Sequence, residues 1–381
     1  MKFTRAVCVA LAVSAAFLCA QAQLVQFTFP AGSPEDQASD AIAKETDAQK
    51  KIALLNDFVQ KFSSNPLAVA YGGWQLAQAY QQAGDLKAAR AAGEKALDAM
   101  PNAVDIAVAL ANIAQQQKDN AAIVNYAARG AAAYDAIARQ PRPAEQAEAD
   151  FAAQVKRQQE SARPAYDYLE GAAFNAIMNE QDAAARMGLV RQFTPAFPKT
   201  RYAAQVAQYA IISLLQTGDF SGLASYGEKA VKENPDNAAV VVLVARGYSE
   251  DQKSPAHLEQ AAVYARRAIA LAQADSSLTA EQKSQMIGTA KSVVGWSLLR
   301  QDKAAAAIPE LKEAAPLLKS NAVDYSTALY GLAFAYAKLN RIAEARATLS
   351  EAVTVEGPYQ QPARELLQKV NAAKPAAPRK Q

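Results

Sequence analysis

The sequence predicts an all-α fold, a right-handed α-solenoid of about seven helix–turn–helix pairs with a C-terminal capping helix. Two observations support this fold class. The chain of 381 residues is rich in alanine and poor in glycine and proline, and only 8% of its residues are aromatic. Helix propensity is therefore high along most of the chain. Apolar and small residues also recur at spacings of three and four in successive segments of similar length. An all-β fold is excluded.

The charge balance and the scarcity of reactive side chains narrow the function. The 40 Lys and Arg nearly balance the 37 Asp and Glu, which argues against a nucleic-acid partner. One His and two Cys leave too few groups for a transition-metal site, a thiol nucleophile or a histidine triad. Phosphate-binding glycine loops and the serine nucleophile elbow are absent from the sequence. We therefore expect a protein that is not an enzyme and that holds no cofactor or metal.

The first segment, residues 1–22, is predicted to be a signal peptide. Lys2 and Arg5 precede an apolar run over 6–20, and an Ala-Gln-Ala pattern places cleavage before Gln23. The run is shorter than the roughly 20 residues that span a bilayer as a helix, although an uncleaved anchor remains the alternative. We expect an exported protein, periplasmic or secreted, with no integral membrane segment after cleavage.

Cleavage would change the thiol content and charge of the chain. Cys8 and Cys19 both lie inside the predicted signal peptide, so the exported chain would have no disulfide and no redox role. Loss of Lys2 and Arg5 would lower the formal net charge of +3 by two.

Residues 23–45 are predicted to form a polar linker. Four residues interrupt any helical pattern there: Pro30, Gly32, Ser33 and Pro34. Helical spacing begins near Asp47, which predicts a lone helix over 46–62.

The clearest helix pair covers 67–82 and 86–99, joined at Gly84–Asp85. Amphipathic spacing on both sides of this turn is what two packed helices require. Three small residues fall where the helix axes would come closest: Ala77, Ala89 and Ala96. Pro101 ends the second helix because it cannot continue the hydrogen-bond ladder.

This pattern resembles the tetratricopeptide repeat family. Five residues occupy the small, aromatic and proline places of its 34-residue pattern: Ala77, Tyr80, Ala89, Ala96 and Pro101. Gly93 stands where the family prefers an aromatic residue, so looser packing is expected there. Ala333, Ala345 and Ala352 repeat the same spacings near the C-terminus. The resemblance implies that first helices line a concave surface that binds a protein or peptide.

The remaining segments complete the predicted array. Helix pairs are expected at 103–117 with 120–138, 163–179 with 181–194, 200–216 with 220–233, 237–250 with 257–273, 279–300 with 303–318, and 323–338 with 342–355. Residues 359–371 have one apolar and one charged face, which suits a capping helix. The polar stretch 139–162 is either an exposed helix or a hinge between the N-terminal helices, 46–138, and the array over 163–371. Residues 372–381 are predicted to be a disordered tail.

The resemblance also identifies candidate partner-binding side chains on the concave face. They are Tyr71, Trp74, Gln78, Asn112, Gln116, Arg246, Trp296, Arg300, Tyr330, Phe334 and Lys338. Aromatic and arginine side chains are the usual anchors of protein interfaces. The alternative is that the aromatic residues simply pack between adjacent repeats. Family members that bind a partner's C-terminal carboxylates use clustered Lys, Arg and Asn, and these are scattered here, so no such clamp is expected.

Two other groups of polar residues were candidates for chemistry. His257 lies near Glu250 and Asp251, and we interpret it as a capping or surface residue because no further His or Cys accompanies it. Carboxylate pairs at helical spacing, Glu94 with Asp98 and Glu310 with Glu313, are predicted to lie on solvent faces.

Two functions remain open. The first is a non-catalytic exported scaffold that binds an unidentified protein or peptide through its concave surface, in a cell-envelope assembly. The second is an envelope- or carbohydrate-processing enzyme whose helices surround a cleft. A convergent cluster of titratable groups in one pocket would distinguish the enzyme from the scaffold.

Overall fold

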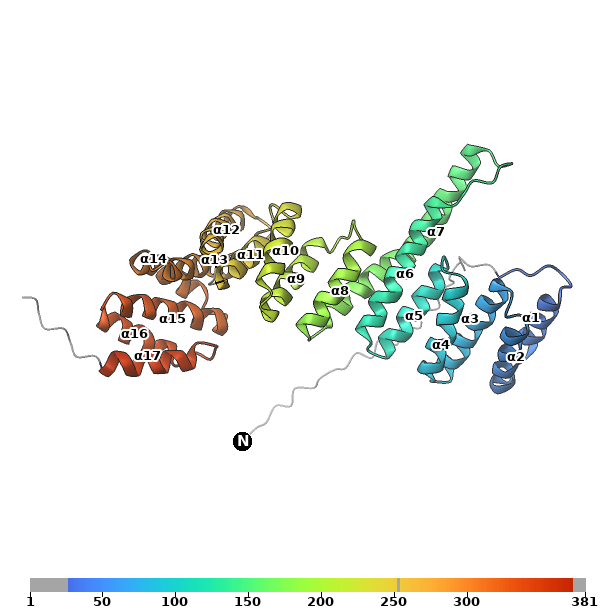
Figure 1. Ribbon diagram of the computed structural model, residues 1–381, viewed down its shortest axis with the longest axis horizontal. Coiled ribbons are helices and arrows are strands. Elements are labelled where there is room, and N and C mark those ends of the chain that lie inside the picture. The colour runs from blue at the N-terminus through green and yellow to red at the C-terminus, as the bar shows by residue number, and fades with distance from the viewer. Residues whose placement is uncertain (1–26, 252–253, 373–381) are drawn as a thin grey trace, which may run out of the picture. The chain divides into compact units, whose positions relative to one another are not determined.

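The computed structural model describes residues 27–251 and 254–372, and these residues form helices without strands. Figure 1 shows the helices following one another along the chain, mostly as antiparallel neighbours. The predicted all-α helical repeat is confirmed. The predicted signal peptide lies outside the described residues, as does the predicted tail apart from Ala372, the last residue of the last helix.

The chain divides into two compact units, 1–118 with 126–169, and 119–125 with 170–381. The helices up to the boundary are α1 Pro34–Lys44, α2 Ala48–Lys61, α3 Pro66–Gln82, α4 Leu86–Ala99, α5 Val104–Gln116, α6 Asn120–Arg139 and α7 Glu148–Asn179. Those that follow are α8 Ala183–Ala196, α9 Ala203–Thr217, α10 Phe220–Glu233, α11 Ala238–Glu250, α12 Pro255–Ala274, α13 Ala280–Arg300, α14 Ala304–Leu317, α15 Ala322–Lys338, α16 Ile342–Ala352 and α17 Gln360–Ala372. The predicted helix pairs are therefore present with small shifts at their ends, except that α7 begins at 148 and not at the predicted 163.

Gly-Asp turns connect the two helices in two of the pairs. Gly84 and Gly218 adopt φ values of 80° and 67°, a left-handed conformation that costs glycine little. Asp85 then caps α4 by accepting a 2.9 Å hydrogen bond from the Ala88 backbone N–H. Asp219 caps α10 in the same way. The short sequence motif thus ends one helix and starts the next.

The predicted linker over 23–45 was wrong for residues 34–44, which form α1. Ser33 caps this helix, because its Oγ accepts a 3.1 Å hydrogen bond from the Asp36 N–H. Pro34 occupies the first turn, where a missing N–H costs nothing. Pro34, interpreted from the sequence as a residue that interrupts a helix, is instead the first residue of α1. As a result α2, which was predicted to be a lone helix, packs against α1.

The polar stretch 139–162 is helical from residue 148 onward. The loop 140–147 follows α6, and α7 then runs without interruption past the predicted start of the next helix, with Pro164 inside it. Figure 1 shows the beginning of α7 projecting beyond the neighbouring helices of the first unit. Gln140 donates to Gln158 at 2.6 Å and Gln146 to Gln154 at 2.8 Å, so side chains of the loop bind back to the helix.

Small residues allow the close helix contacts that the sequence predicts. Ala89 and Ala96 are fully buried, and a Cβ at Gly73 would lie 2.9 Å from the Ala92 carbonyl oxygen. The expectation of loose packing at Gly93 was wrong. A Cβ there would lie 2.8 Å from Cδ2 of Leu110, so the α5 side chain fills the space that an aromatic residue would take.

The carboxylate pairs predicted for solvent faces connect neighbouring helices. Glu94 pairs with Arg90 at 3.2 Å and accepts a hydrogen bond from the hydroxyl of Tyr126 on α6. Glu310 and Glu313 both pair with Lys291 of α13, at 3.6 and 2.9 Å. The four carboxylate side chains are 27–69% exposed, so they also face solvent as predicted.

Candidate functional site

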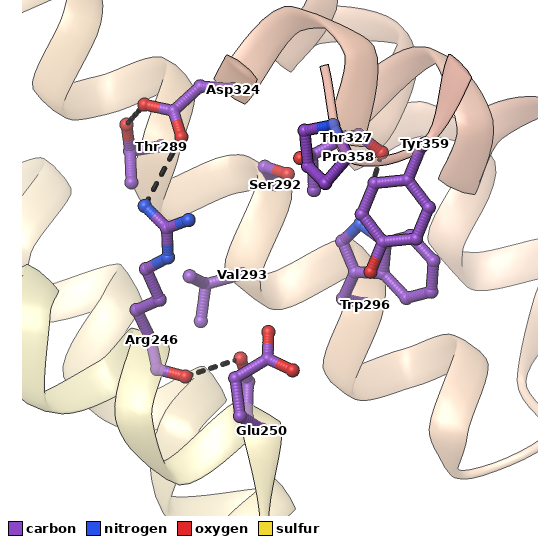
Figure 2. A pocket seen from close by; sticks show the side chains of 11 residues that line it. Arg246, Glu250, Thr289, Ser292, Val293, Trp296, Asp324, Thr327, Pro358 and Tyr359 are labelled. Atoms are coloured by element: carbon purple, nitrogen blue, oxygen red, sulfur yellow. Dashed lines mark hydrogen bonds and ion pairs between the residues drawn. The ribbon is translucent and has the colours of Figure 1, made fainter. Parts of the chain in front are cut away.

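A cavity of about 210 Å³ lies in the second unit on helices α11, α13 and α15. Figure 2 shows the side chains that line it, with Tyr359 on the side formed by the segment before α17. They are Arg246, Ser249, Glu250, Thr289, Ser292, Val293, Trp296, Asp324, Thr327, Pro358 and Tyr359. Helices α11, α13 and α15 are the first helices of three consecutive pairs, so the cavity, hereafter the inner pocket, lies on the face where binding residues were predicted.

An ion pair crosses the inner pocket. Arg246 Nη1 on α11 lies 3.2 Å from Asp324 Oδ1 on α15. The other oxygen of Asp324 accepts hydrogen bonds from Gln285 at 2.9 Å and Thr289 at 3.5 Å. Asp324 is thus a fixed carboxylate, with a side chain only 14% exposed, whereas the Arg246 side chain is 39% exposed and keeps further N–H groups toward the pocket.

A second ion pair lies beside an aromatic ring. Arg300 Nη2 donates to Glu250 Oε2 at 2.8 Å, and its guanidinium lies 5.4 Å from the centre of the Trp296 ring. Stacking over tryptophan favours a cation at this distance. The two arginines and two carboxylates make the inner pocket balanced in charge.

Stacked aromatic rings form one wall of the inner pocket. Tyr359 lies 5.5 Å from Trp296 and 4.9 Å from Tyr330, between centroids, and Tyr330 stacks on Phe334 at 6.3 Å. The indole N–H of Trp296 donates to the Thr327 carbonyl at 3.2 Å, which fixes the orientation of the ring. Burial raises the pKa of Tyr330 and of Tyr359, so both phenols are protonated at neutral pH.

Ser292 offers the inner pocket a hydrogen-bonding group that the chain does not use. The residue is 7% exposed, and its hydroxyl makes no hydrogen bond to any residue in the described part of the chain. A ligand in the inner pocket can therefore form a hydrogen bond with this hydroxyl. The cavity is smaller than the roughly 300–1,000 Å³ of ordinary small-molecule sites, so its size fits one side chain.

The structure brings the predicted second-unit residues together along this face. Arg246 and Trp296 line the inner pocket, and Arg300 and Tyr330 contact its lining residues. Phe334 continues the aromatic wall along α15. Lys338 Nζ lies 5.7 Å from the centre of the Phe334 ring and also forms an ion pair with Asp302.

The predicted first-unit residues lie on α3 and α5, and two of them contact other side chains of the first unit. Tyr71 makes edge contacts with Phe27, Phe29 and Phe58 at 5.5–5.7 Å, so it packs within its own chain. Trp74 and Gln78 lie half-buried on α3, and Gln116 is exposed on α5. Asn112 contacts the hydroxyl of Tyr168 on α7. For Tyr71 these contacts are the ones that the packing interpretation expects.

Sequence reasoning missed several residues of the inner pocket, which are Asp324, Ser292, Thr289 and Tyr359. Asp324 is 78 residues from Arg246, and no local spacing indicates such a pair. Tyr359 follows the Gly357–Pro358 turn that ends a repeat, where the family pattern assigns no binding position.

His257 belongs to the packing of α11 against α12. Its Nδ1 lies 2.7 Å from Asp251 Oδ2, and its ring stacks on Tyr248 with centroids 4.7 Å apart. The residues that the structure describes contain no group of three or more His, Cys, Asp or Glu side chains arranged to hold a metal ion. None of their helices is long and apolar enough to span a bilayer.

Comparison with known proteins gives structural neighbours only. No family profile and no curated protein matches the sequence. A thermophilic TPR protein of Thermus thermophilus is 15% identical, with a TM-score of 0.38 over 50% of this chain and 91% of its own. The TPR domain of P58(IPK) is 13% identical, with a TM-score of 0.30 over 89% of this chain and 98% of its own. The fold of the present chain is established by its own helix pairs.

Proposed function

We propose that this protein is a non-catalytic interaction scaffold that binds a segment of a partner protein or peptide at the inner pocket. The observation that supports this function is the convergence of aromatic, arginine and hydroxyl side chains from the first helices of three consecutive pairs. Such side chains dominate binding energy at protein interfaces. The pocket volume fits one anchoring side chain, and Phe334 and Lys338 extend the surface beyond it.

The pairing of the acidic residues favours binding over the processing enzyme. Glu250 and Asp324 are the carboxylates among the lining residues, and each forms an ion pair with an arginine. Asp324 also accepts hydrogen bonds from Gln285 and Thr289, and Glu250 accepts one from Arg300. Both carboxylates are thus engaged by side chains of the chain itself, which favours a structural role over a catalytic one.

The test of this function compares two arginine substitutions. Arg246→Gln removes the guanidinium that faces the inner pocket, while Arg266→Gln removes an exposed guanidinium on α12 outside it. We expect the wild type and Arg266→Gln to capture a partner from envelope extract in stoichiometric amount. Capture by Arg246→Gln should fall about tenfold, as expected for loss of a charge-assisted contact. Equal capture by both variants would show that the inner pocket is not the binding site.

We also propose that the chain is exported to the periplasm or secreted and works in a cell-envelope assembly. The support is the charged start, apolar run and small-residue pattern over 1–22. N-terminal sequencing of the protein from cells is expected to begin at Gln23. An N-terminus that retains Met1 or Lys2 in the mature protein would contradict cleavage and export by this route.

A further inference from the structure

One residue of the aromatic wall comes from outside the first helices. Tyr359 belongs to the segment 353–359 between α16 and α17, yet its ring stacks on rings of α13 and α15. It meets Trp296 at an interplanar angle of 26° and Tyr330 at 17°. Figure 2 shows the Tyr359 ring beside the indole of Trp296. The C-terminal part of the chain therefore covers rings of the concave face.

The two rings that Tyr359 covers are fixed by contacts of their own. Trp296 and Tyr330 lie 6.2 Å apart between centroids, at an interplanar angle of 22°. The indole N–H donates to the Thr327 carbonyl, and a Cβ at Gly331 would lie 3.0 Å from Trp296 Nε1, so the indole packs directly on α15. Trp296 and Tyr330 thus form an aromatic platform whose fixing contacts do not involve Tyr359.

The side chain of Tyr359 is attached to this platform by stacking. Its hydroxyl makes no hydrogen bond with any residue that the structure describes. Helix α17, which follows it, has two buried residues, Ala363 and Val370. The path of the segment is set where Gly357 passes α15, because a Cβ there would overlap the Ser326 hydroxyl and lie 2.9 Å from Ser326 Cβ. The ring can therefore leave the platform without breaking a hydrogen bond of its own.

We propose that Tyr359 is an internal lid on the inner pocket, and that the anchor of the partner is an aromatic side chain that takes its place on the platform. This inference rests on the scaffold function proposed above and names the anchor. A ring from the partner replaces one stack by another of the same kind. The ring is also neutral, which suits a pocket in which Asp324 and Glu250 already pair with arginines.

A lid lowers the observed affinity of the pocket. The internal ring competes with an added one, and the apparent dissociation constant rises by the reciprocal of the fraction of molecules in which the lid is open. Removal of the Tyr359 ring should therefore tighten the binding of a free aromatic ligand. A ring that is a permanent part of the wall would have the opposite effect, since its removal would weaken binding. The sign of the change separates the two roles.

The binding experiment uses the full chain and N-acetyl-L-tyrosinamide, and saturation-transfer NMR gives the dissociation constants. We expect Tyr359→Ala to bind this probe about tenfold more tightly than the wild type, because the platform is open in every molecule. N-acetyl-L-leucinamide should bind Tyr359→Ala about fivefold more weakly than the tyrosine probe, since its side chain cannot stack. Equal or weaker binding of the tyrosine probe by Tyr359→Ala would overturn the lid, and equal binding of the two probes would overturn the aromatic anchor.

Tyr209→Ala is the matched control. Tyr209 on α9 is also half-buried and contacts an aromatic ring, that of Phe174, at 6.3 Å between centroids. It does not line the inner pocket, so this variant should bind the tyrosine probe as the wild type does. Tighter binding by both variants would show that general loosening of the helices exposes the platform, which contradicts a lid.

Gly357→Ala opens the lid without changing the Tyr359 ring. The added methyl group overlaps Ser326, so the segment must move, and the probe should bind about as tightly as to Tyr359→Ala. Adding Ser326→Gly removes the obstacle and should restore the wild-type affinity. This series decides the question if Tyr359→Ala fails to fold by circular dichroism. Unchanged binding by Gly357→Ala would contradict the proposal.

Capture of the partner from envelope extract separates the lid from the scaffold function. We expect Tyr359→Ala to capture more partner than the wild type, whereas Arg246→Gln captures less. If both variants capture less, the inner pocket binds the partner and Tyr359 is a permanent part of its wall, so the lid is wrong and the scaffold function stands. If Arg246→Gln has no effect, the scaffold function fails at this pocket, and the tyrosine probe still decides whether Tyr359 is a lid.

Discussion

Gly73 determines how closely α3 and α4 approach each other. A methyl group there would lie 2.9 Å from the Ala92 carbonyl oxygen and 3.1 Å from the Ala96 side chain, and that backbone atom cannot move aside alone. We expect Gly73→Ala to lower the free energy of unfolding by about 1–3 kcal/mol through overpacking. Urea unfolding followed by circular dichroism measures this change.

Gly188 on α8 provides the matched control, because a Cβ there meets nothing within 4 Å. Replacing a helical glycine by alanine removes backbone freedom from the unfolded chain, so Gly188→Ala should raise the free energy of unfolding by about 0.4–1 kcal/mol. If the two substitutions change stability in the same direction, Gly73 is not required for the close approach of α3 and α4.

Single residues also show the limit of what could be predicted from the sequence. Ala89 and Ala96 were placed correctly because helical spacing is local information. The partner of Arg246 was not found, since Asp324 belongs to a different helix pair and their contact depends on how the pairs stack. Tyr71 has the residue type and position of a binding side chain, yet its ring packs against Phe27 and Phe29.

At the scale of elements, α1 itself has one buried residue, and the segment just before it also packs against the first unit. In that segment Phe29 is 8% exposed and contacts Phe58 of α2 and Tyr71 of α3, whereas the preceding residue, Thr28, is exposed. We expect Phe29→Ala to cost about 3–5 kcal/mol locally and to speed amide hydrogen exchange in α1 and α2.

Thr28→Ala is the control for this substitution, since its side chain points to solvent. Unchanged exchange in α1 after Phe29→Ala would mean that the helix is held by its contacts with α2 alone.

The elements that were predicted well and badly differ for a physical reason. Helices such as α4 combine a cap, an apolar stripe and a turn motif, and these signals agree. In α1 the only buried residue is Ile42, so the apolar period is too weak to identify the helix, and the proline at its start resembles a breaker. The long α7 hides its length because its first half is mostly exposed and polar.

Across the whole molecule, buried tyrosines predict a loss of stability at alkaline pH. Burial and neighbouring carboxylates raise the pKa of Tyr126, Tyr226 and Tyr325 to about 12, above the roughly 10 of an unfolded chain. Folding therefore favours the protonated phenol. Its contribution to stability is complete below pH 10 and is lost as the pH rises to about 12.

Phenolate absorbance and circular dichroism recorded together from pH 8 to 13 test this expectation. The free energy of unfolding should fall above pH 10, and Tyr126→Phe should make that fall shallower. A melting temperature that is unchanged between pH 9 and 11.5 would contradict it.

The serial arrangement of helices predicts that damage stays local. Helices of this chain contact mainly their near neighbours in sequence, as in other repeat proteins. Leu97 is fully buried in α4, and Leu97→Ala should cost about 2–5 kcal/mol. We expect faster hydrogen exchange in α3 to α5 and no change in α13 to α16. A uniform change in both regions would show that the chain unfolds as one cooperative body.

The chain contains two tryptophans, Trp74 on α3 in the first unit and Trp296 at the inner pocket in the second. Each unit thus carries its own intrinsic emitter. Trp74→Phe would leave a single indole, stacked against Tyr359 and beside a guanidinium, whose emission wavelength and quantum yield report directly on whatever enters that space.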